Sequence, residues 1–288
     1  MFKSLTVVSL VATVALAQTS SLVPSGISDK CSSFLTELNT DTALSKCTGT
    51  LSQALAAFAP GTSSASATAV STALTTLCGS DVNTQCPTSV FASKITAFYS
   101  ACSEELTTKS NADVVRIYDV LYIVSPMRQA ICSKADDGSW CVTAATPAAG
   151  TSADAVQAAL YTKSGDNVVP NTSTFTTYNL PFLFLNPDTA DLCKTCTKNV
   201  LNAFITHESD LPYAPGLGNS QLLKTQSDLY KAVQEKCGAN FMSGEVKAAG
   251  GLSTGNSIIG GSNGALAGAE FSTAAAAFVG FMTLAAIF

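Results

Sequence analysis

The chain has 288 residues, a net charge of −5 and ten Cys, and 12% of its residues are charged. Soluble globular proteins usually carry about 25% charged residues, so this composition differs from that of an ordinary cytosolic protein. Basic residues number 15 against 20 acidic ones, which excludes the concentrated positive charge of a nucleic-acid-binding protein, and we expect no nucleic-acid partner. An even number of Cys favours a disulfide framework formed in an oxidising compartment.

The N-terminus has the pattern of a secretory signal peptide. Lys3 supplies an early positive charge, an apolar run follows, and Ala15-Leu16-Ala17 ends it with the small residues that signal peptidase recognises. A buried N-terminal helix is the alternative, although such a helix normally has a polar face. We therefore predict that residues 1–17 are removed by cleavage after Ala17.

The C-terminus has the pattern of a glycosylphosphatidylinositol (GPI) attachment signal. The segment Ala274–Phe288 is apolar apart from Thr283. As a helix it would span about 22 Å, less than the ~30 Å hydrocarbon core of a bilayer, and no Lys or Arg follows it. Small residues and a spacer precede it, which indicates attachment at Asn263, with Ser262 and Gly261 as alternatives. A single-pass anchor or a secreted form without an anchor is the alternative to GPI.

These signals divide the chain into four parts. We expect a signal peptide at 1–17, a Cys-rich ectodomain at 18–242, a Gly/Ser-rich tether at 243–263 and a GPI-attachment propeptide at 264–288. The tether would have a root-mean-square reach of about 25 Å. All ten Cys fall inside the ectodomain, as an extracellular disulfide framework requires.

Apolar residues at helical spacing predict an all-α ectodomain, a disulfide-stapled helical bundle. Asn111 or Asp113 is a candidate N-cap for one helix, and Pro60-Gly61 is a candidate stop for an earlier one. The apolar stripes are Cys31–Leu38, Ala43–Cys47, Leu51–Phe58, Val70–Leu77, Phe91–Cys102, Val114–Tyr122, Cys193–Phe204 and Leu223–Cys237.

Several helix boundaries follow from single residues. Thr50 is a candidate N-cap that would separate two short helices, and Ser125-Pro126 predicts an interruption of a long one. Asp188 is a candidate N-cap for the helix that carries Cys193. The last long helix is expected to begin near Asn219 and to end at Gly238.

The stretch 142–187 departs from the helical pattern. It is rich in Ala, Thr, Ser, Pro and Asn, which predicts a long irregular loop region with one short helical candidate at Ala153–Tyr161. The single N-glycosylation sequon lies here, so we predict a glycan on Asn171. The segment Thr177–Leu185 is apolar enough to pack against the bundle, although Pro181 argues against a central strand.

The strongest candidate for chemistry is Cys193-Lys194-Thr195-Cys196, which has the CxxC spacing of thiol oxidoreductases. Its surroundings are helical rather than βαβ, and both sulfurs share one apolar face. We expect two disulfides to different partners, with a thiol oxidoreductase as the alternative. Zinc is disfavoured because the sequence has neither a second CxxC nor a His pair.

Other candidate residues lack the partners that catalysis needs. His207 precedes Glu208, but no second His completes HExxH and no GxSxG occurs, so we expect a polar residue near a helix end. Asp136-Asp137-Gly138 predicts a turn, and Trp140 a core anchor rather than a sugar-stacking platform. We predict no catalytic residue, no cofactor and no metal, while paired-carboxylate glycosidase chemistry stays open because no local constellation selects two acids.

All ten Cys are expected in disulfides, but ten Cys allow hundreds of connectivities. We predict only local pairs, Cys31–Cys47, Cys78–Cys86 and Cys132–Cys141, each of which closes a short loop. Longer bridges between the central and C-terminal helices would then use Cys102, Cys193, Cys196 and Cys237.

Four motifs occur in a fixed order: Cys31-Ser32-Ser33-Phe34-Leu35 with Cys47 sixteen residues after Cys31, Asp137-Gly138-Ser139-Trp140-Cys141, Leu192-Cys193-Lys194-Thr195-Cys196 and Cys237-Gly238-Ala239-Asn240-Phe241. Together they resemble a family of fungal secreted, Cys-rich, GPI-anchored proteins classed as a domain of unknown function, over about Lys30–Met242. The resemblance implies a fungal cell-surface or cell-wall location and a disulfide-bonded helical domain. It supplies no catalytic residue.

We therefore expect a GPI-anchored fungal cell-surface or cell-wall protein with a structural or interaction role, and not an enzyme. Its expected partner is the membrane, through the anchor, with cell-wall glucan or a lipid ligand as further candidates. The alternative is a secreted lipid- or sterol-binding helical module, because disulfide-tied helices can enclose an apolar cavity.

Overall fold

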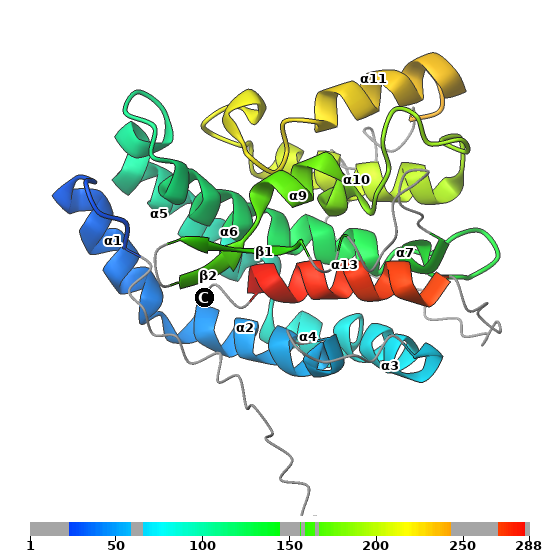
Figure 1. Cartoon of the computed structure of the whole chain (residues 1–288), viewed down its shortest axis with the longest axis horizontal. Coiled ribbons are helices and arrows are strands. Elements are labelled where there is room, and N and C mark those ends of the chain that lie inside the picture. The colour runs from blue at the N-terminus through cyan, green and yellow to red at the C-terminus, as the bar shows by residue number, and fades with distance from the viewer. Residues whose placement is uncertain are drawn as a thin grey trace, which may run out of the picture.

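Helices and one β-hairpin make up the part of the chain that the structure describes (Figure 1). The computed structural model describes residues 23–58, 66–144, 156, 159–164, 167–242 and 270–285. Its α-helices are α1 (Asp29–Asn39), α2 (Thr42–Ala54), α3 (Ala67–Leu77), α4 (Ser80–Gln85), α5 (Thr88–Leu106), α6 (Ala112–Ile131), α7 (Cys141–Ala144), α9 (Thr172–Thr177), α10 (Thr195–Asp210), α11 (Gln226–Cys237) and α13 (Glu270–Ala285). The remaining elements are the 3₁₀ turns η1 (Ala56–Phe58), η2 (Leu180–Phe182) and η3 (Leu217–Asn219) and the antiparallel strands β1 (Tyr161–Ser164) and β2 (Asn167–Pro170). The predicted disulfide-stabilised helical fold is confirmed.

Side chains at the N-termini explain why several helices begin where they do. Helices α1, α2, α3 and α6 each start after a residue whose side-chain oxygen accepts a hydrogen bond from the first turn, namely Ser28, Asp41, Ser66 and Asn111. These bonds satisfy backbone N–H groups that have no partner inside the helix. Of the two candidate caps of α6, the structure therefore selects Asn111.

Helix α6 runs through the centre of the molecule, where it packs against α5, α10 and α13. Fifteen of its 20 residues are buried, as expected for a helix covered on all sides. The predicted interruption at Ser125-Pro126 is wrong, because α6 continues through Pro126 to Ile131. The packing around α6 offsets the free-energy cost of the backbone hydrogen bond that Pro126 cannot donate.

Five disulfides pair all ten Cys, and each joins residues at least 39 positions apart. The predicted local pairs Cys31–Cys47, Cys78–Cys86 and Cys132–Cys141 are wrong. Bonding follows helix packing instead: α1 packs against α5 and α2 against α4, so successive helices turn their buried Cys toward different neighbours. The pairs are Cys31–Cys102, Cys47–Cys86, Cys78–Cys132, Cys141–Cys196 and Cys193–Cys237.

The five disulfides fall into two groups in separate parts of the chain. Three of them lie within residues 31–132, and two lie within residues 141–237. We call these segments the N-terminal half and the C-terminal half. No disulfide joins one half to the other, so their association depends on packing and on hydrogen bonds.

Two helix boundaries predicted in the N-terminal half are wrong. The sequence pattern predicts one helix at Ala43–Cys47 and a second at Leu51–Phe58, with Thr50 as the N-cap of the second. In the structure, α2 runs through Thr50 without a break. The Thr50 hydroxyl donates to the Lys46 carbonyl oxygen at 2.9 Å, a bond that a Thr makes inside a helix. Helix α2 ends at Ala54, and η1 then buries Phe58.

Two boundaries in the C-terminal half also differ from the prediction. Helix α10 begins at Thr195 rather than near Asp188, because the Asn186 side chain accepts the Asp188 N–H at 3.0 Å and holds a turn there. Helix α11 begins at Gln226 rather than near Asn219, which ends η3. The predicted end of α11 at Gly238 is confirmed, with a φ of 85° that favours glycine.

The stretch 142–187 contains more regular structure than predicted, since its described residues include the hairpin β1–β2, α9 and η2. Tyr161 pairs with Pro170 at one end of the hairpin. Most of the helical candidate Ala153–Tyr161 lies outside the described residues. The segment Thr177–Leu185 packs against the bundle as predicted, with Leu180 and Phe182 fully buried.

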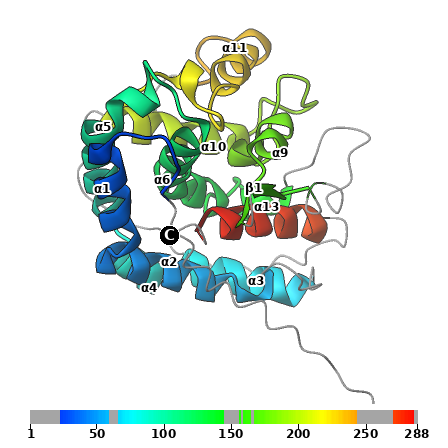
Figure 2. The same ribbon diagram turned by 60° about the vertical axis from the view of Figure 1, so that its left-hand side comes forward.

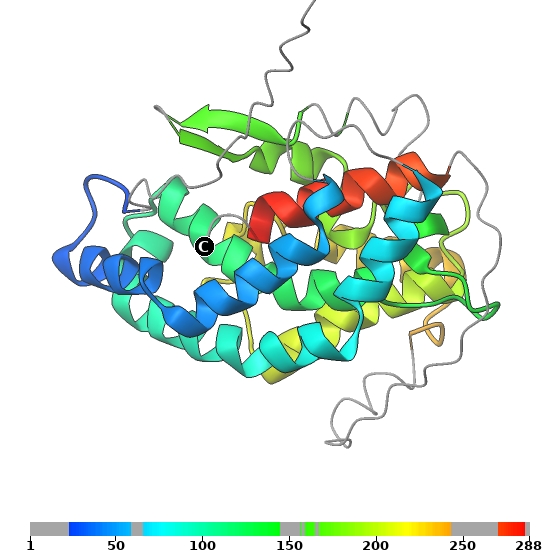
Figure 3. The same cartoon turned by 90° about the horizontal axis from the view of Figure 1, so that it is seen from below.

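The C-terminal helix α13 lies in the middle of the molecule, between α2 and α3 on one side and α6 and α7 on the other (Figures 1 and 3). The sequence pattern predicts that residues 264–288, which include α13, form a propeptide that is removed. The predicted cleavage residue Ala17, the tether 243–263 and the attachment residue Asn263 lie outside the described residues. Within the described part of the chain, every helix is too short or too polar to cross a membrane.

Candidate functional site

An open pocket of about 730 Å³ lies in the C-terminal half and is the first candidate for a binding site. Its lining includes the apolar residues Leu183, Phe184 and Val200 and both Cys of the CxxC motif. The volume falls in the range of about 300–1,000 Å³ that small-molecule sites occupy. The pocket therefore has room for a small molecule with an apolar body.

Two residues that line this pocket, Leu183 and Phe184, have positive φ, and so does Asn179, which precedes them in the same segment. Asn179, Leu183 and Phe184 have φ values of 49°, 51° and 66°. Residues other than glycine seldom adopt this conformation, and such strain is concentrated at functional sites. Hydrogen bonds hold the segment in place: the Phe184 N–H donates to the Asn179 carbonyl at 3.0 Å, and the Asn179 side chain donates to the Leu185 carbonyl at 2.8 Å.

The rim of the pocket is polar and links two segments. The Thr195 hydroxyl at the start of α10 donates to the Asp136 carboxylate at 2.5 Å. Asp137 accepts both the hydroxyl and the backbone N–H of Ser139, and these two bonds lower the pKa of the Asp137 carboxyl. The predicted turn at Asp136-Asp137-Gly138 is confirmed, with Gly138 at a φ of 83°.

The CxxC motif has no thiol in this structure. Cys196 is bonded to Cys141 and Cys193 to Cys237, each with an S–S length of 2.06 Å. The two sulfurs thus tie the start of α10 to α7 and to the end of α11. A thiol oxidoreductase would need Cys193 and Cys196 to exchange with each other, which this pairing does not provide.

Trp140 lies beside the pocket and is half-buried against the core. The Lys134 ammonium nitrogen lies 4.4 Å from the centroid of the Trp140 ring, a favourable cation–π distance. Lys134 and Trp140 also form a β-bridge that closes the loop between them. One face of the ring is therefore covered by a cation rather than open for a sugar.

A second candidate, which the sequence analysis missed, is a buried polar cluster around Asp119 of α6. The Asp119 carboxylate accepts the Tyr213 hydroxyl at 2.5 Å and the backbone N–H groups of Gln221 and Leu222 at 2.6 and 3.2 Å. Burial nevertheless raises the pKa of Asp119 to about 6. The only sequence signal was an acidic residue inside an apolar stripe.

His207 and Glu208 lie on α10 on the other side of this cluster. The His207 ring is buried edge-on against Tyr122, with ring centroids 4.8 Å apart. Burial lowers the pKa of His207 to about 4 and raises the pKa of Glu208, whose carboxylate accepts the Gln226 side-chain amide at 2.8 Å. The structure thus places His207 among core aromatic residues near the end of α10, away from the open pocket.

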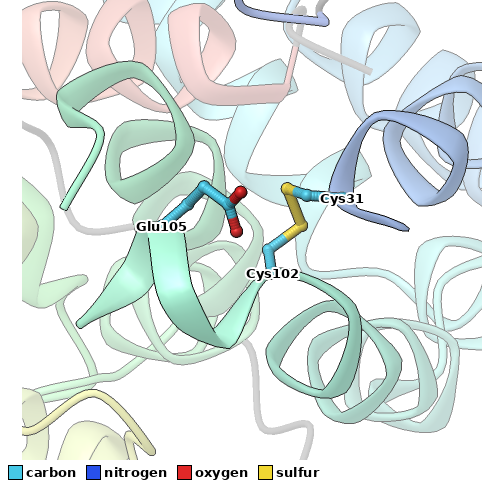
Figure 4. Close-up of side chains that lie close together, drawn as sticks. All are labelled: Cys31, Cys102 and Glu105. Atoms are coloured by element: carbon cyan, nitrogen blue, oxygen red, sulfur yellow. A yellow bond between two sulfur atoms is a disulfide. The ribbon is translucent and has the colours of Figure 1, made fainter. Parts of the chain in front are cut away.

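Among the described residues, Cys31, Cys102 and Glu105 are the group whose donor atoms lie close enough for a metal (Figure 4). The two sulfurs form a disulfide and carry no thiolate, so this set does not fit a metal ion. One Glu105 oxygen accepts the Ser28 N–H at 2.7 Å. The group therefore fastens the start of α1 to the end of α5.

The predicted glycosylation residue Asn171 precedes α9 and is partly exposed. Its backbone N–H donates to the Leu160 carbonyl at 2.8 Å, so the sequon lies at the junction of the hairpin and α9. Ser173, the third residue of the sequon, is exposed.

The fold and the pocket define a disulfide-stabilised helical domain, and five disulfides are typical of a secreted or extracellular protein. The chain belongs to the family described as Domain of unknown function (DUF7729), which matches residues 17–246. No curated protein and no solved structure matches the chain.

Proposed function

We propose that this protein is a GPI-anchored cell-surface or cell-wall protein of a fungus, with a structural or interaction role. The observation that carries the proposal is the complete pairing of ten Cys in bridges between helices. Such a framework requires an oxidising compartment, and the sequence signals at both ends of the chain are those of a secreted, lipid-anchored protein.

Attachment of the anchor would follow the usual exchange of one amide for another. The peptide bond between Asn263 and Gly264 breaks, and the Asn263 carbonyl forms an amide with the terminal amine of the glycolipid. Residues 264–288, which include α13, leave as a peptide with a new amino terminus. The mature protein would then consist of the helical domain, with a glycan on Asn171, and its tether.

We also propose a role without catalysis. Two observations support it: His207 is buried among aromatic rings, and both Cys of the CxxC motif are bonded to other partners. His207 lies away from the open pocket, and the two Cys that line the pocket are held in disulfides and offer no thiolate. Protein–protein contact or attachment to cell-wall glucan would use the exposed surface instead.

The experiment is release of the protein from intact host cells with phosphatidylinositol-specific phospholipase C. We expect the protein to appear in the supernatant with a C-terminal peptide that ends near Asn263 and carries a glycan remnant. A chain that stays with the cells and extends to Phe288 would contradict the proposal. Release by glucanase instead of phospholipase, with the same C-terminus, would indicate transfer to the wall.

A second function, a lipid- or sterol-binding module, is favoured by one observation. The apolar helix α13 is buried between other helices although the sequence predicts its removal. A domain that encloses a removable apolar segment has space for an apolar ligand.

A further inference from the structure

Helix α13 lies between α3 and the β1–β2 hairpin (Figure 2), and its residues 274–281 are buried. We call the space that this helix occupies the channel. Its 16 residues correspond to a length of about 24 Å. Every residue from Ala274 to Val279 is at most 3% exposed, and Phe281 is fully buried. The described middle of this helix, residues 274–281, therefore takes the place of an apolar volume.

The walls of the channel come from both halves of the domain. Helices α2 and α3 with η1 contribute one side, and α6, α7 and β2 contribute the other. The segments α3, η1 and α7 contain no charged residue at all. Helices α2 and α6 do contain charged residues, but the side chains shown to meet α13 are the apolar Phe58, Leu180 and Phe175. These contacts suit a hydrocarbon rather than a polar ligand.

Individual contacts show how closely the walls fit. The Phe58 ring meets the Phe278 ring at a centroid distance of 4.9 Å and an interplanar angle of 63°. A Cβ atom at Gly280 would lie only 2.2 Å from the Leu180 side chain and 3.7 Å from the Phe175 ring. Because only hydrogen fits there, α13 lies directly against Leu180.

Covalent structure does not hold α13 in this channel. The helix contains no Cys, and all five disulfides lie between residues 31 and 237. Its single charged residue is Glu270 at the first position. The helix can therefore leave without breaking a disulfide, and its apolar packing is the interaction that is lost.

The residues that match the family model include most of the channel walls but not α13, which fills the channel. The match covers residues 17–246, which include α2, α3, α6 and α7, and it ends before α13. The residues that the chain shares with its family thus form the walls, and the segment that fills them lies outside.

We propose that the channel filled by α13 in the unprocessed chain is a lipid-binding site of the mature protein, where the acyl chain of a membrane lipid replaces the helix. This inference rests on the proposed function, since removal of residues 264–288 vacates the channel. An empty channel would expose a large apolar surface to water, which favours an apolar occupant. One leaflet of a bilayer has a hydrocarbon thickness of about 15 Å, so an acyl chain fits within the length of α13.

The test uses the mature protein released from host membranes by phospholipase C, with its C-terminus determined by peptide mass spectrometry. Organic extraction should recover a bound acyl lipid, and the extracted protein should bind a fluorescent long-chain fatty acid. Leu180→Trp fills the channel and should weaken this binding at least tenfold. Leu217→Trp, a half-buried site on η3, is the matched control and should bind as the wild type does.

The outcomes separate the two proposals. A chain that ends near Asn263 but binds neither lipid nor fatty acid overturns the lipid site and leaves the anchor intact. Equal binding by the Leu180→Trp and Leu217→Trp variants also overturns it. A chain that extends to Phe288 refutes the proposed function itself, and the lipid site falls with it.

The full-length chain provides an independent test. Gly280→Leu should displace α13 from Leu180 and raise fatty-acid uptake at least tenfold over that of the wild-type chain. Gly49→Leu is the control, because a Cβ atom at Gly49 of α2 meets no atom within 4 Å. If the Gly280→Leu variant unfolds instead, α13 is an obligatory part of the core and the proposal is wrong.

Discussion

The two halves of the domain are stabilised in different ways. In the N-terminal half, four of the six helices α1–α6 start at side-chain caps such as Asn111, and three bridges join them, including the fully buried Cys31–Cys102. In the C-terminal half, α10 starts at Thr195, the preceding Lys194 provides no side-chain cap, and the bridge from Cys193 is at the surface. The pocket and the three positive-φ residues, of which Leu183 and Phe184 line it, also belong to this half. The N-terminal half is therefore held mainly by capped helices and buried bridges, whereas the C-terminal half carries the open pocket.

The channel lies at the junction of these halves. Helix α13 contacts α2 and α3 of the first and α7 of the second, and no disulfide crosses between the halves. Ligand sites commonly occur where two packed units meet. The halves can therefore adjust to a new occupant while the disulfides keep each of them folded.

Removal of one bridge from each half should have the largest effect. In the chain-entropy model each bridge contributes about 4 kcal/mol. Cys31→Ala/Cys102→Ala should lose more than this, because both sulfurs are buried and leave a cavity. The matched pair Cys193→Ala/Cys237→Ala should lose no more than the entropic part. Urea unfolding measures both, and equal losses would argue against the difference between the halves.

Phe278→Ala in the full-length chain tests how strongly α13 connects the halves. Its ring is fully buried against Phe58, so we expect a loss of about 3–5 kcal/mol in the free energy of unfolding. Phe34→Ala is the control, since Phe34 is half-buried on α1 and should lose less. An unchanged midpoint in thermal unfolding of the Phe278→Ala variant would mean that α13 does not pack in the core.

The buried cluster between α6 and α10 should give two opposite pH dependences. Asp119 has a folded pKa of about 6 against an ordinary 3.8, so its contribution to stability is present below pH 3.8 and is lost as the pH rises through 6. His207 has a folded pKa of about 4 against 6.5, so its contribution is present above pH 6.5 and is lost as the pH falls through 4.

Single variants separate these contributions. In His207→Gln, stability should fall by about 3 kcal/mol between pH 4 and 6, and in Asp119→Asn it should rise by a similar amount. The readout is the slope of the unfolding free energy against pH from urea titrations. Parallel slopes in the two variants would contradict the burial of one or both groups.

Exchange of helix caps should give the smallest effects. Asn111→Ala removes two hydrogen bonds from the first turn of α6 and should cost about 1 kcal/mol. Lys194→Ser supplies a cap to α10 and removes a cation from its N-terminus, so it should stabilise by several tenths of a kcal/mol. Its lost ion pair with Asp191 is exposed and contributes little. Thermal unfolding measures both, and the same sign for both would contradict the contrast in capping.

The presence of most helices could be predicted from the sequence, because the spacing of apolar residues in stripes such as Val70–Leu77 is a local signal. Tertiary packing decided the rest. Thr50 resembles a cap and Pro126 a break, yet burial of the flanking residues keeps both inside helices. Disulfide partners depended on which helix faces meet, and chain proximity carries no such information.

The candidate sites were harder to predict for the same reason. The CxxC motif marked one wall of the pocket, but the strained segment around Leu183 and Phe184 had no recognisable signal. Asp119 binds backbone groups about a hundred residues away, at Gln221 and Leu222. The channel could not be inferred, because an apolar C-terminus gives the same pattern whether it packs in a core or enters a membrane.

The most direct measurement is native mass spectrometry of the protein released from host membranes by phospholipase C. We expect a polypeptide that ends near Asn263, with a non-covalent adduct in the mass range of an acyl lipid that organic extraction removes. A polypeptide that extends to Phe288 without an adduct would contradict this expectation.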